Sequence, residues 1–129
     1  MNVPKELFYT KEHEWAKIEG DTATIGITDY AQHQLGDIVY VEFVDAGKEV
    51  KQTERIGTIE SVKAVSDIFS PLSGVIVEVN EFLKEHPEMI NQEPYGKGWM
   101  VKLKIKDRAE IQSLMKADEY EKYIKEESK

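Results

Sequence analysis

One lysine, Lys63, stands between two stretches of β-prone sequence, and its primary amine is a group that could carry a covalent modification. Residues 56–62 before it and 65–69 after it are rich in β-branched and aromatic side chains, which favour extended backbone. The second stretch ends at residues 70–74, Ser-Pro-Leu-Ser-Gly, which is a strong turn signal. The pattern predicts a β-hairpin with Lys63 at its tip, although the tip has no Asn-Gly or Asp-Gly pair. On these residues alone, an ordinary solvated lysine is the more common explanation.

Other residue types that carry chemistry form no recognisable constellation. The three histidines, His13, His33 and His86, lack the spacing typical of a metal site. The Gly-Lys-Gly of residues 96–98 lacks the strand-to-helix context of a phosphate-binding loop, and no serine lies in a nucleophile motif. There is no cysteine, so thiol chemistry would have to come from a prosthetic group or a partner. The sequence therefore predicts neither a metal site nor a catalytic residue.

Length and charge limit the class of protein. The chain has 129 residues, enough for one domain with a hydrophobic core. Its net charge of −8 makes nucleic acid and anionic membranes improbable partners, and no apolar run reaches membrane-spanning length. The N-terminus has neither an apolar signal core nor an Arg-rich leader. We therefore expect a cytoplasmic protein, with a processed organellar protein as the alternative.

The first half of the chain predicts short strands and one helix. Residues 14–18 and 22–27 predict two strands joined by a turn at Gly-Asp. Thr28 is a candidate helix N-cap and Gly36 a candidate helix stop. Residues 37–44 carry apolar side chains on both faces, so we expect a strand that is buried on both sides.

The second half adds two strands, a loop and helices. Residues 75–79 predict a strand with its three valines inward, so a charge at Val77 should be strongly destabilising. Residues 87–98, with two prolines and two glycines, predict a long loop. Residues 99–105 predict a strand with the odd-numbered side chains inward and Met100 outward.

Two helices are expected at the C-terminus. The first should start at Asp107, and the second at Asp118, which forms a capping-box pattern with Glu121. The tail, residues 126–129, is expected to fray. Many short strands followed by terminal helices predict a mainly β core with helical appendages.

The stretch Glu60-Ser-Val-Lys63-Ala64, followed by Ser-Pro-Leu-Ser-Gly, resembles the lipoyl-attachment segment of the glycine cleavage system H protein family. Similar stretches occur in the family's order along nearly the whole chain. A biotin carrier would be expected to place Met on both sides of the lysine, and lipoyl domains of 2-oxoacid dehydrogenases usually have Asp-Lys-Ala. Val62 and Ala64 depart from these patterns and favour the H protein family. The other matching stretches are His13-Glu14-Trp15, residues 24–29 (Thr-Ile-Gly-Ile-Thr-Asp), residues 35–37 (Leu-Gly-Asp) and residues 94–100 (Pro-Tyr-Gly-Lys-Gly-Trp-Met).

The resemblance implies a fold and a role for the whole chain, residues 1–129, as a single lipoyl-carrier domain. The implied fold is a flattened β-sandwich, a barrel-sandwich hybrid of the lipoyl/biotinyl type, with short helices of which two lie at the C-terminus. The implied role is a non-catalytic carrier with lipoate attached covalently to Lys63. It would move an aminomethyl group from the pyridoxal-phosphate enzyme glycine decarboxylase to aminomethyltransferase. Dihydrolipoamide dehydrogenase and a lipoate ligase or lipoyl transferase are the other implied partners.

The resemblance also suggests roles for four acidic residues. In this family a cleft can shelter the loaded arm, and the acidic position of Glu14 is implicated in holding the amine. Relatives often carry a hydroxyl residue where this chain has Glu12, so a second carboxylate is expected there. Glu60 and Asp67 flank the predicted tip. They could be recognised by the lipoate-attaching enzyme or contact the charged arm. Solubility and protection of a strand edge explain these two residues equally well.

Two alternative functions remain open at this stage. A lipoate-relay carrier would donate lipoyl groups to other lipoyl domains, and a transfer assay with acceptor domains would detect it. An unmodified interaction module would keep the fold without the lipoyl group, and the intact mass of the natural protein would identify it.

Overall fold

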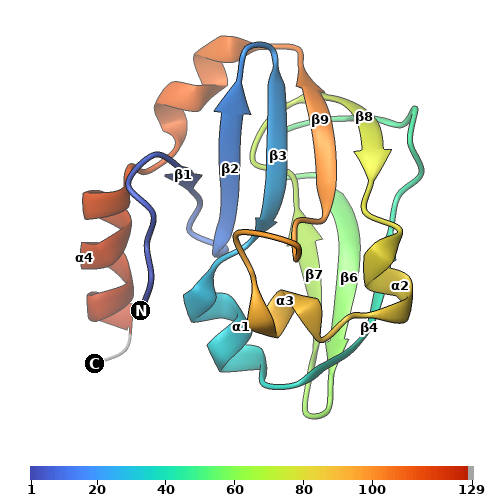
Figure 1. The fold of residues 1–129 in the computed structure, drawn as a ribbon. Helices are drawn as coiled ribbons and strands as arrows, with labels where there is room; N and C mark the ends of the chain where they lie inside the picture. The colour runs from blue at the N-terminus through green and yellow to red at the C-terminus, as the bar shows by residue number, and fades with distance from the viewer. Residues whose placement is uncertain (128–129) are drawn as a thin grey trace.

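The fold consists of two β-sheets with short helices at one end and a longer helix at the side, as seen in the computed structural model, which describes residues 1–127 (Figure 1). A six-stranded sheet has the order β1-β2-β3-β9-β8-β5, and a three-stranded sheet has the order β4-β6-β7. All pairings are antiparallel. The strands are β1 (Phe8–Tyr9), β2 (Glu14–Glu19), β3 (Thr22–Ile27), β4 (Ile38–Phe43), β5 (Glu49–Val50), β6 (Arg55–Ser61), β7 (Val65–Phe69), β8 (Gly74–Val79) and β9 (Val101–Ile105). The helices are α1 (Asp29–Leu35), α2 (Phe82–Glu85), α3 (Met89–Gln92), the 3₁₀ helix η1 (Arg108–Ser113) and α4 (Ala117–Glu127).

The first hairpin and the helix after it follow the predicted signals. Gly20 takes the left-handed conformation (φ 64°) in the turn between β2 and β3, which glycine adopts without steric cost. The Thr28 side chain accepts a hydrogen bond from the backbone N–H of Ala31 and so caps α1. At the other end, Gly36 (φ 77°) donates its N–H to the carbonyl of Gln32.

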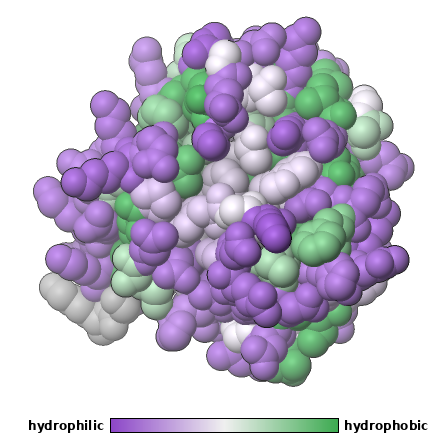
Figure 2. All heavy atoms as spheres, in the orientation of Figure 1, coloured by the Kyte–Doolittle hydropathy of each residue, from purple (hydrophilic) through white to green (hydrophobic). Residues whose placement is uncertain are grey.

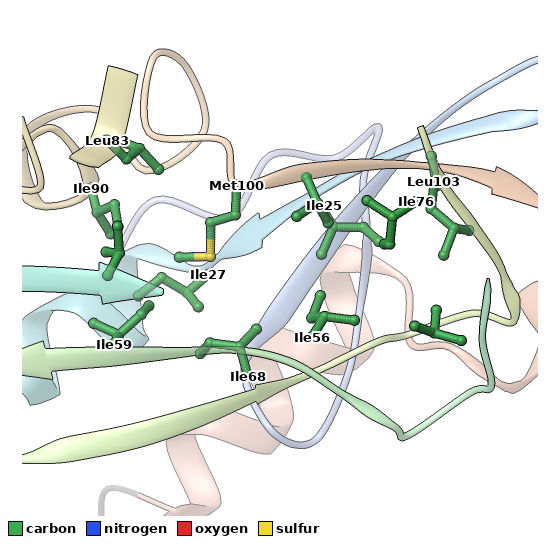
Figure 3. Packing of buried hydrophobic residues seen from close by; sticks show 14 of the residues in the cluster. Ile25, Ile27, Ile56, Ile59, Ile68, Ile76, Leu83, Ile90, Met100 and Leu103 are labelled. Carbon is green, nitrogen blue, oxygen red and sulfur yellow. The ribbon is translucent and has the colours of Figure 1, made fainter. Parts of the chain in front are cut away.

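The main core lies between the two sheets. Buried isoleucines project from both sheets toward one another, and Leu83 of α2 and Ile90 of α3 close one end (Figure 3). Such burial of aliphatic side chains is the dominant favourable term in folding. On the outside, the face in Figure 2 shows hydrophobic side chains in small groups among hydrophilic ones. The central core residues include Ile25, Ile27, Ile56, Ile59, Ile68, Ile76, Met100 and Leu103.

The predicted inward face of β8 is wrong. Ile76 is completely buried, whereas Val77 is 49% exposed and Val75 and Val79 are partly exposed. Ile76 lies opposite Leu103 of β9, and the register shifts just after it, between Ile76 and Glu78. Because side chains alternate with a period of two, a strand that buries Ile76 turns Val75 and Val77 away. Val79 lies beyond the register shift and packs against the core, as predicted.

Two other inferences about buried faces are also corrected. In β4 only Ile38 and Val41 are buried, and Tyr40 is exposed, because β4 is the edge strand of the three-stranded sheet and its outer face is open to solvent. Met100 is completely buried rather than outward. It precedes β9, and its backbone N–H bonds to the carbonyl of Ile25, so it does not follow the alternation of that strand.

The loop and the C-terminal helices differ in detail from expectation. The predicted loop over residues 87–98 contains α3. Asp107 does cap the next helix, which is 3₁₀. However, α4 begins before Asp118, and Glu119 accepts the backbone N–H of Lys116, so the capping contact lies two residues earlier than predicted. The expected frayed tail is helical as far as Glu127, and its last two residues lie outside the described part of the chain.

The corrected face of β8 gives a direct test by substitution. Ile76→Asp should lower the free energy of unfolding by several kcal/mol, because it buries an unpaired charge in the core. Val77→Asp, one residue away, should change stability by less than about 1 kcal/mol, because the side chain is half in solvent. Denaturant unfolding of both variants measures the difference, and similar losses of stability would contradict this orientation of the strand.

Candidate functional site

Lys63 lies at the tip of the β6–β7 hairpin, where a tight turn joins the two strands. The backbone N–H of Ser61 donates to the carbonyl of Ala64 at 2.8 Å. The Ser61 hydroxyl oxygen accepts the N–H groups of Lys63 (3.3 Å) and Ala64 (3.1 Å). A buried serine side chain thus closes a turn that has no Asn-Gly pair. Ser61 was missed in the sequence, where a hydroxyl two residues before the tip was the available signal.

The tip is also tied to the end of α1. The backbone N–H of Val62 donates to the carbonyl of Asp37 at 3.0 Å. The Lys63 Cε lies 3.4 Å from the position that a Cβ at residue 36 would occupy, so the lysine stem runs over Gly36. Lys63 itself is exposed. Its amine is therefore accessible to solvent, while the backbone beneath it is held by hydrogen bonds on both sides.

Glu60 and Asp67 lie on the outer face of the three-stranded sheet. Asp67 accepts a hydrogen bond from the Thr58 hydroxyl at 3.1 Å, and Glu60 lies opposite Tyr40 and Val65 on the neighbouring strands. Both acidic residues are exposed. The residue after Asp67, Ile68, faces the core, so Asp67 points to the other side of the sheet. The two residues flank the tip but face away from the sandwich interior.

Glu14 is buried inside the molecule, with 1% of its surface exposed. One carboxylate oxygen accepts the Thr10 hydroxyl at 2.6 Å, and the other accepts the backbone N–H of Phe69 at 3.2 Å. Burial raises the pKa of Glu14 from about 4.5 to about 7, although these two hydrogen bonds act in the opposite direction. Thr10 was missed in the sequence. It supplies a hydroxyl beside Glu14, although position 12 is occupied by Glu12.

A cavity of about 560 Å³ lies beside Glu14, between the N-terminal segment and the base of the β6–β7 hairpin. Glu12 and Glu14 both line it, so the structure brings these two predicted carboxylates together. The other lining residues are Tyr9, Thr10, Lys11, Gln52, Thr53, Phe69, Ser70, Pro71, Ser113, Leu114 and Met115.

A smaller cleft of about 260 Å³ lies along α1. Ile27 and Leu35 form part of its apolar wall, and Ser66, three residues past Lys63, lines it from β7. Glu12 lines this cleft as well as the larger cavity, whereas Glu14 lines the larger cavity. Glu12 therefore stands where the two spaces approach each other. The remaining lining residues are His13, Tyr30, Ala31, Gln34, Ile68 and Glu127.

Over residues 1–127, no group of three or more His, Cys, Asp or Glu side chains is placed to hold a metal ion. No helix in the same range is long and apolar enough to cross a membrane.

The comparisons with known proteins agree on one family. Residues 7–127 match the sequence model of the family described as Glycine cleavage H-protein. The chain is 53% identical over 126 residues to the glycine cleavage system H protein of Halothermothrix orenii, covering 98% of each chain. It is 55% identical to that of Geobacillus kaustophilus, covering 98% of this chain and 99% of the relative. A crystal structure of the H protein of Mycobacterium marinum superposes with a TM-score of 0.81 at 37% identity, covering 92% of this chain and 95% of that one.

The two sheets, the short helices and the exposed lysine at a hairpin tip define a carrier protein with a lipoyl-type β-sandwich. More particularly, the chain belongs to the glycine cleavage H-protein family. Membership of this family assigns it a lipoyl-carrier role in glycine cleavage.

The raised pKa of Glu14 makes stability depend on pH. Between about pH 4.5 and 7 the folded protein keeps a proton on Glu14 that the unfolded chain releases, so stability falls as pH rises through this range. Glu14→Gln removes this dependence while keeping a hydrogen-bonding side chain. The variant should therefore gain up to about 3 kcal/mol over wild type between pH 4.5 and 7.5. Urea unfolding at several pH values measures this, and the exposed Glu12→Gln is the matched control. If the difference in the free energy of unfolding between Glu14→Gln and wild type does not change with pH, the raised pKa of Glu14 is contradicted.

Proposed function

We propose that this protein carries lipoate in amide linkage on Lys63 and, as a non-catalytic subunit, moves the aminomethyl group of glycine between enzymes. The exposed Lys63 amine at the end of a hydrogen-bonded hairpin carries the proposal. A modifying enzyme can reach such an amine, and amide formation removes its charge. The bound group would supply the thiol chemistry that this cysteine-free chain lacks.

The residues around Lys63 fit such a group. A side chain at residue 36 would lie at van der Waals distance from the lysine stem, and Gly36 leaves that space open. Ser61 fixes the backbone on which the arm would pivot. What the protein contributes is therefore attachment, a fixed origin for the arm and a surface on which the arm can rest.

The proposed partners are the enzymes that act on this arm in turn. They are glycine decarboxylase, aminomethyltransferase and dihydrolipoamide dehydrogenase, with a lipoate ligase or lipoyl transferase for attachment. We propose that Glu60 and Asp67, exposed on the outer face beside the tip, contact the attaching enzyme. An enzyme that acylates the lysine amine must approach the tip itself, because no arm yet extends its reach. We also propose a cytoplasmic location.

We further propose that the cleft along α1 shelters the loaded arm. The Lys63 stem already lies at the C-terminal end of α1, and the cleft is lined by Leu35 at that end and by Tyr30 near the helix start, about 7.5 Å away along the helix axis. An arm laid in the cleft would contact Ile27 and Leu35 and reach Glu12. The amine of the arm would be cationic near neutral pH, and Glu12 and Glu14 would be its carboxylate partners. Resting there would keep water from the cargo.

Attachment at Lys63 is tested by mass. Incubation with lipoate ligase and lipoate should add one lipoyl group, located at Lys63 by peptide mapping. Lys63→Arg keeps the charge but should accept none, because a guanidinium is not acylated under these conditions. Lys97, exposed on another part of the surface, provides a matched control as Lys97→Arg, which should be modified normally. Modification of the Lys63→Arg protein at a different lysine would contradict the assignment.

The shelter is tested by the lifetime of the loaded arm. Glu14→Gln should accept lipoate and cargo normally but lose the cargo faster when no transferase is present. A fully realised charge-assisted hydrogen bond of about 1.5–3 kcal/mol corresponds to a ten- to hundredfold faster loss. The Glu12→Gln/Glu14→Gln double variant should lose the cargo faster still, since Glu12 lines both spaces. Equal decay in wild type and double variant, followed by intact mass, would show that these carboxylates do not hold the amine.

A further inference from the structure

His13 joins the N-terminal segment to the C-terminal helix through both ring nitrogens. Its Nδ1 lies 2.8 Å from the Tyr120 hydroxyl, and its Nε2 lies 3.0 Å from a carboxylate oxygen of Glu127. The ring also packs against Tyr30, with the centroids 4.8 Å apart. His13 has a left-handed backbone (φ 70°), which directs this side chain toward α4. His13, which the sequence showed only as part of a matching stretch, therefore links segments that are distant in the chain.

The positions of the protons follow from the partners. A carboxylate only accepts, so Nε2 must carry a proton and donate it to Glu127. In neutral His13 the other nitrogen then accepts from Tyr120, whose phenol stays protonated because burial raises its pKa. The Tyr120 oxygen in turn accepts from the Thr28 hydroxyl, 2.7 Å away. Since Thr28 and Tyr120 are completely buried, this chain of donors satisfies groups that cannot reach solvent.

This cluster lies at one end of the cleft along α1. His13 and Glu127 line the cleft together with Glu12, and the other lining side chains are uncharged. His13 is mostly covered, with 16% of its side chain exposed, whereas Glu127 is 39% exposed. The Tyr123 hydroxyl donates to the backbone carbonyl of Lys11 at 3.3 Å, and the neighbouring Glu127 carboxylate raises the pKa of Tyr123. Glu127 therefore faces the imidazole of His13 and the phenol of Tyr123, and its remaining side is open to the cleft.

We infer that Glu127 is a third carboxylate for the amine of the loaded arm, held at the end of the cleft by His13. The inference rests on the proposed carrier function and adds to Glu12 and Glu14 a residue from the C-terminal helix. In the empty cleft Glu127 accepts the His13 N–H. When a cationic amine lies in the cleft, its N–H donors compete with the imidazole for the same carboxylate oxygens. The last turn of α4 is thus part of the arm site.

Exchange of partners has a consequence for His13 that can be observed. When an ammonium takes over the Glu127 carboxylate, the hydrogen bond from His13 Nε2 to that carboxylate is lost. The NMR signals of the His13 ring should therefore shift when the arm is loaded. They should also shift in the unloaded Glu127→Gln variant, in which the charged acceptor is gone.

The experiment compares three variants of the full-length lipoylated protein with wild type. Glu127→Gln removes the carboxylate, and Glu121→Gln is the matched control on the same helix, exposed and outside the cleft. His13→Asn removes the imidazole but tolerates the left-handed backbone. Cargo loss is followed by intact mass in the absence of partner enzymes, and the NMR signals of the His13 ring are recorded before and after loading.

We expect Glu127→Gln to lose cargo about two- to fivefold faster than wild type, because that is the effect of losing one partly exposed ion pair. Glu121→Gln should behave as wild type, and His13→Asn should hold cargo as long or longer, because Glu127 is then free for the amine. Faster loss in both Glu127→Gln and His13→Asn would overturn the inference, since it would indicate a loosened helix. Equal decay in Glu127→Gln and wild type, or His13 ring signals that do not shift on loading, would overturn it too. If wild type takes up no cargo on lipoyl-Lys63, the proposed function itself fails, and this inference fails with it.

Discussion

The hydrogen bond from the Phe69 backbone to the buried carboxylate of Glu14 connects the two sheets at the base of the lysine hairpin. Glu14 begins β2 in the six-stranded sheet, and Phe69 ends β7 in the three-stranded sheet. A carboxyl group in this position is costly to desolvate, and it is retained with a hydroxyl and a backbone N–H as partners. The direction of the hairpin relative to α1, and hence the position of Lys63 beside Gly36, depends on how these sheets are aligned.

Much of the fold was predictable because local signals and tertiary packing agree. Thr28 and Gly36 set the two ends of α1 through interactions within a few residues. Gly20 likewise forms the turn of the first hairpin through its local backbone conformation. The β6–β7 hairpin was predicted from its two β-prone arms. In each case the residues that decide the structure are neighbours in the sequence, so no knowledge of distant contacts was needed.

The errors arose where the deciding contact lies far along the chain. Three valines in β8 suggested an inward face, but pairing with β9 buries Ile76 and turns Val75 and Val77 outward, while Val79 packs against the core beyond the irregularity. Apolar residues on both faces of β4 suggested double burial, yet whether a second layer covers a strand is a property of the whole fold. The site shows the same division. The position of Lys63 at a hairpin tip was predicted from its own segment, whereas the contacts of Thr10, His13 and Glu127 involve elements that meet only after folding.

The turn closed by Ser61 also determines how the arm would explore space. The hydrogen bonds of the tip hold the backbone under Lys63 in one conformation. A group attached there would therefore pivot about a fixed point, and not move together with a flexible loop. Docking of its end on the protein would then be an intramolecular event, governed by an effective concentration that for short flexible tethers is about millimolar. Weak contacts in a small cleft would suffice to hold the arm at such a concentration. A partner enzyme would therefore need to offer only a modestly better binding site in order to receive the cargo.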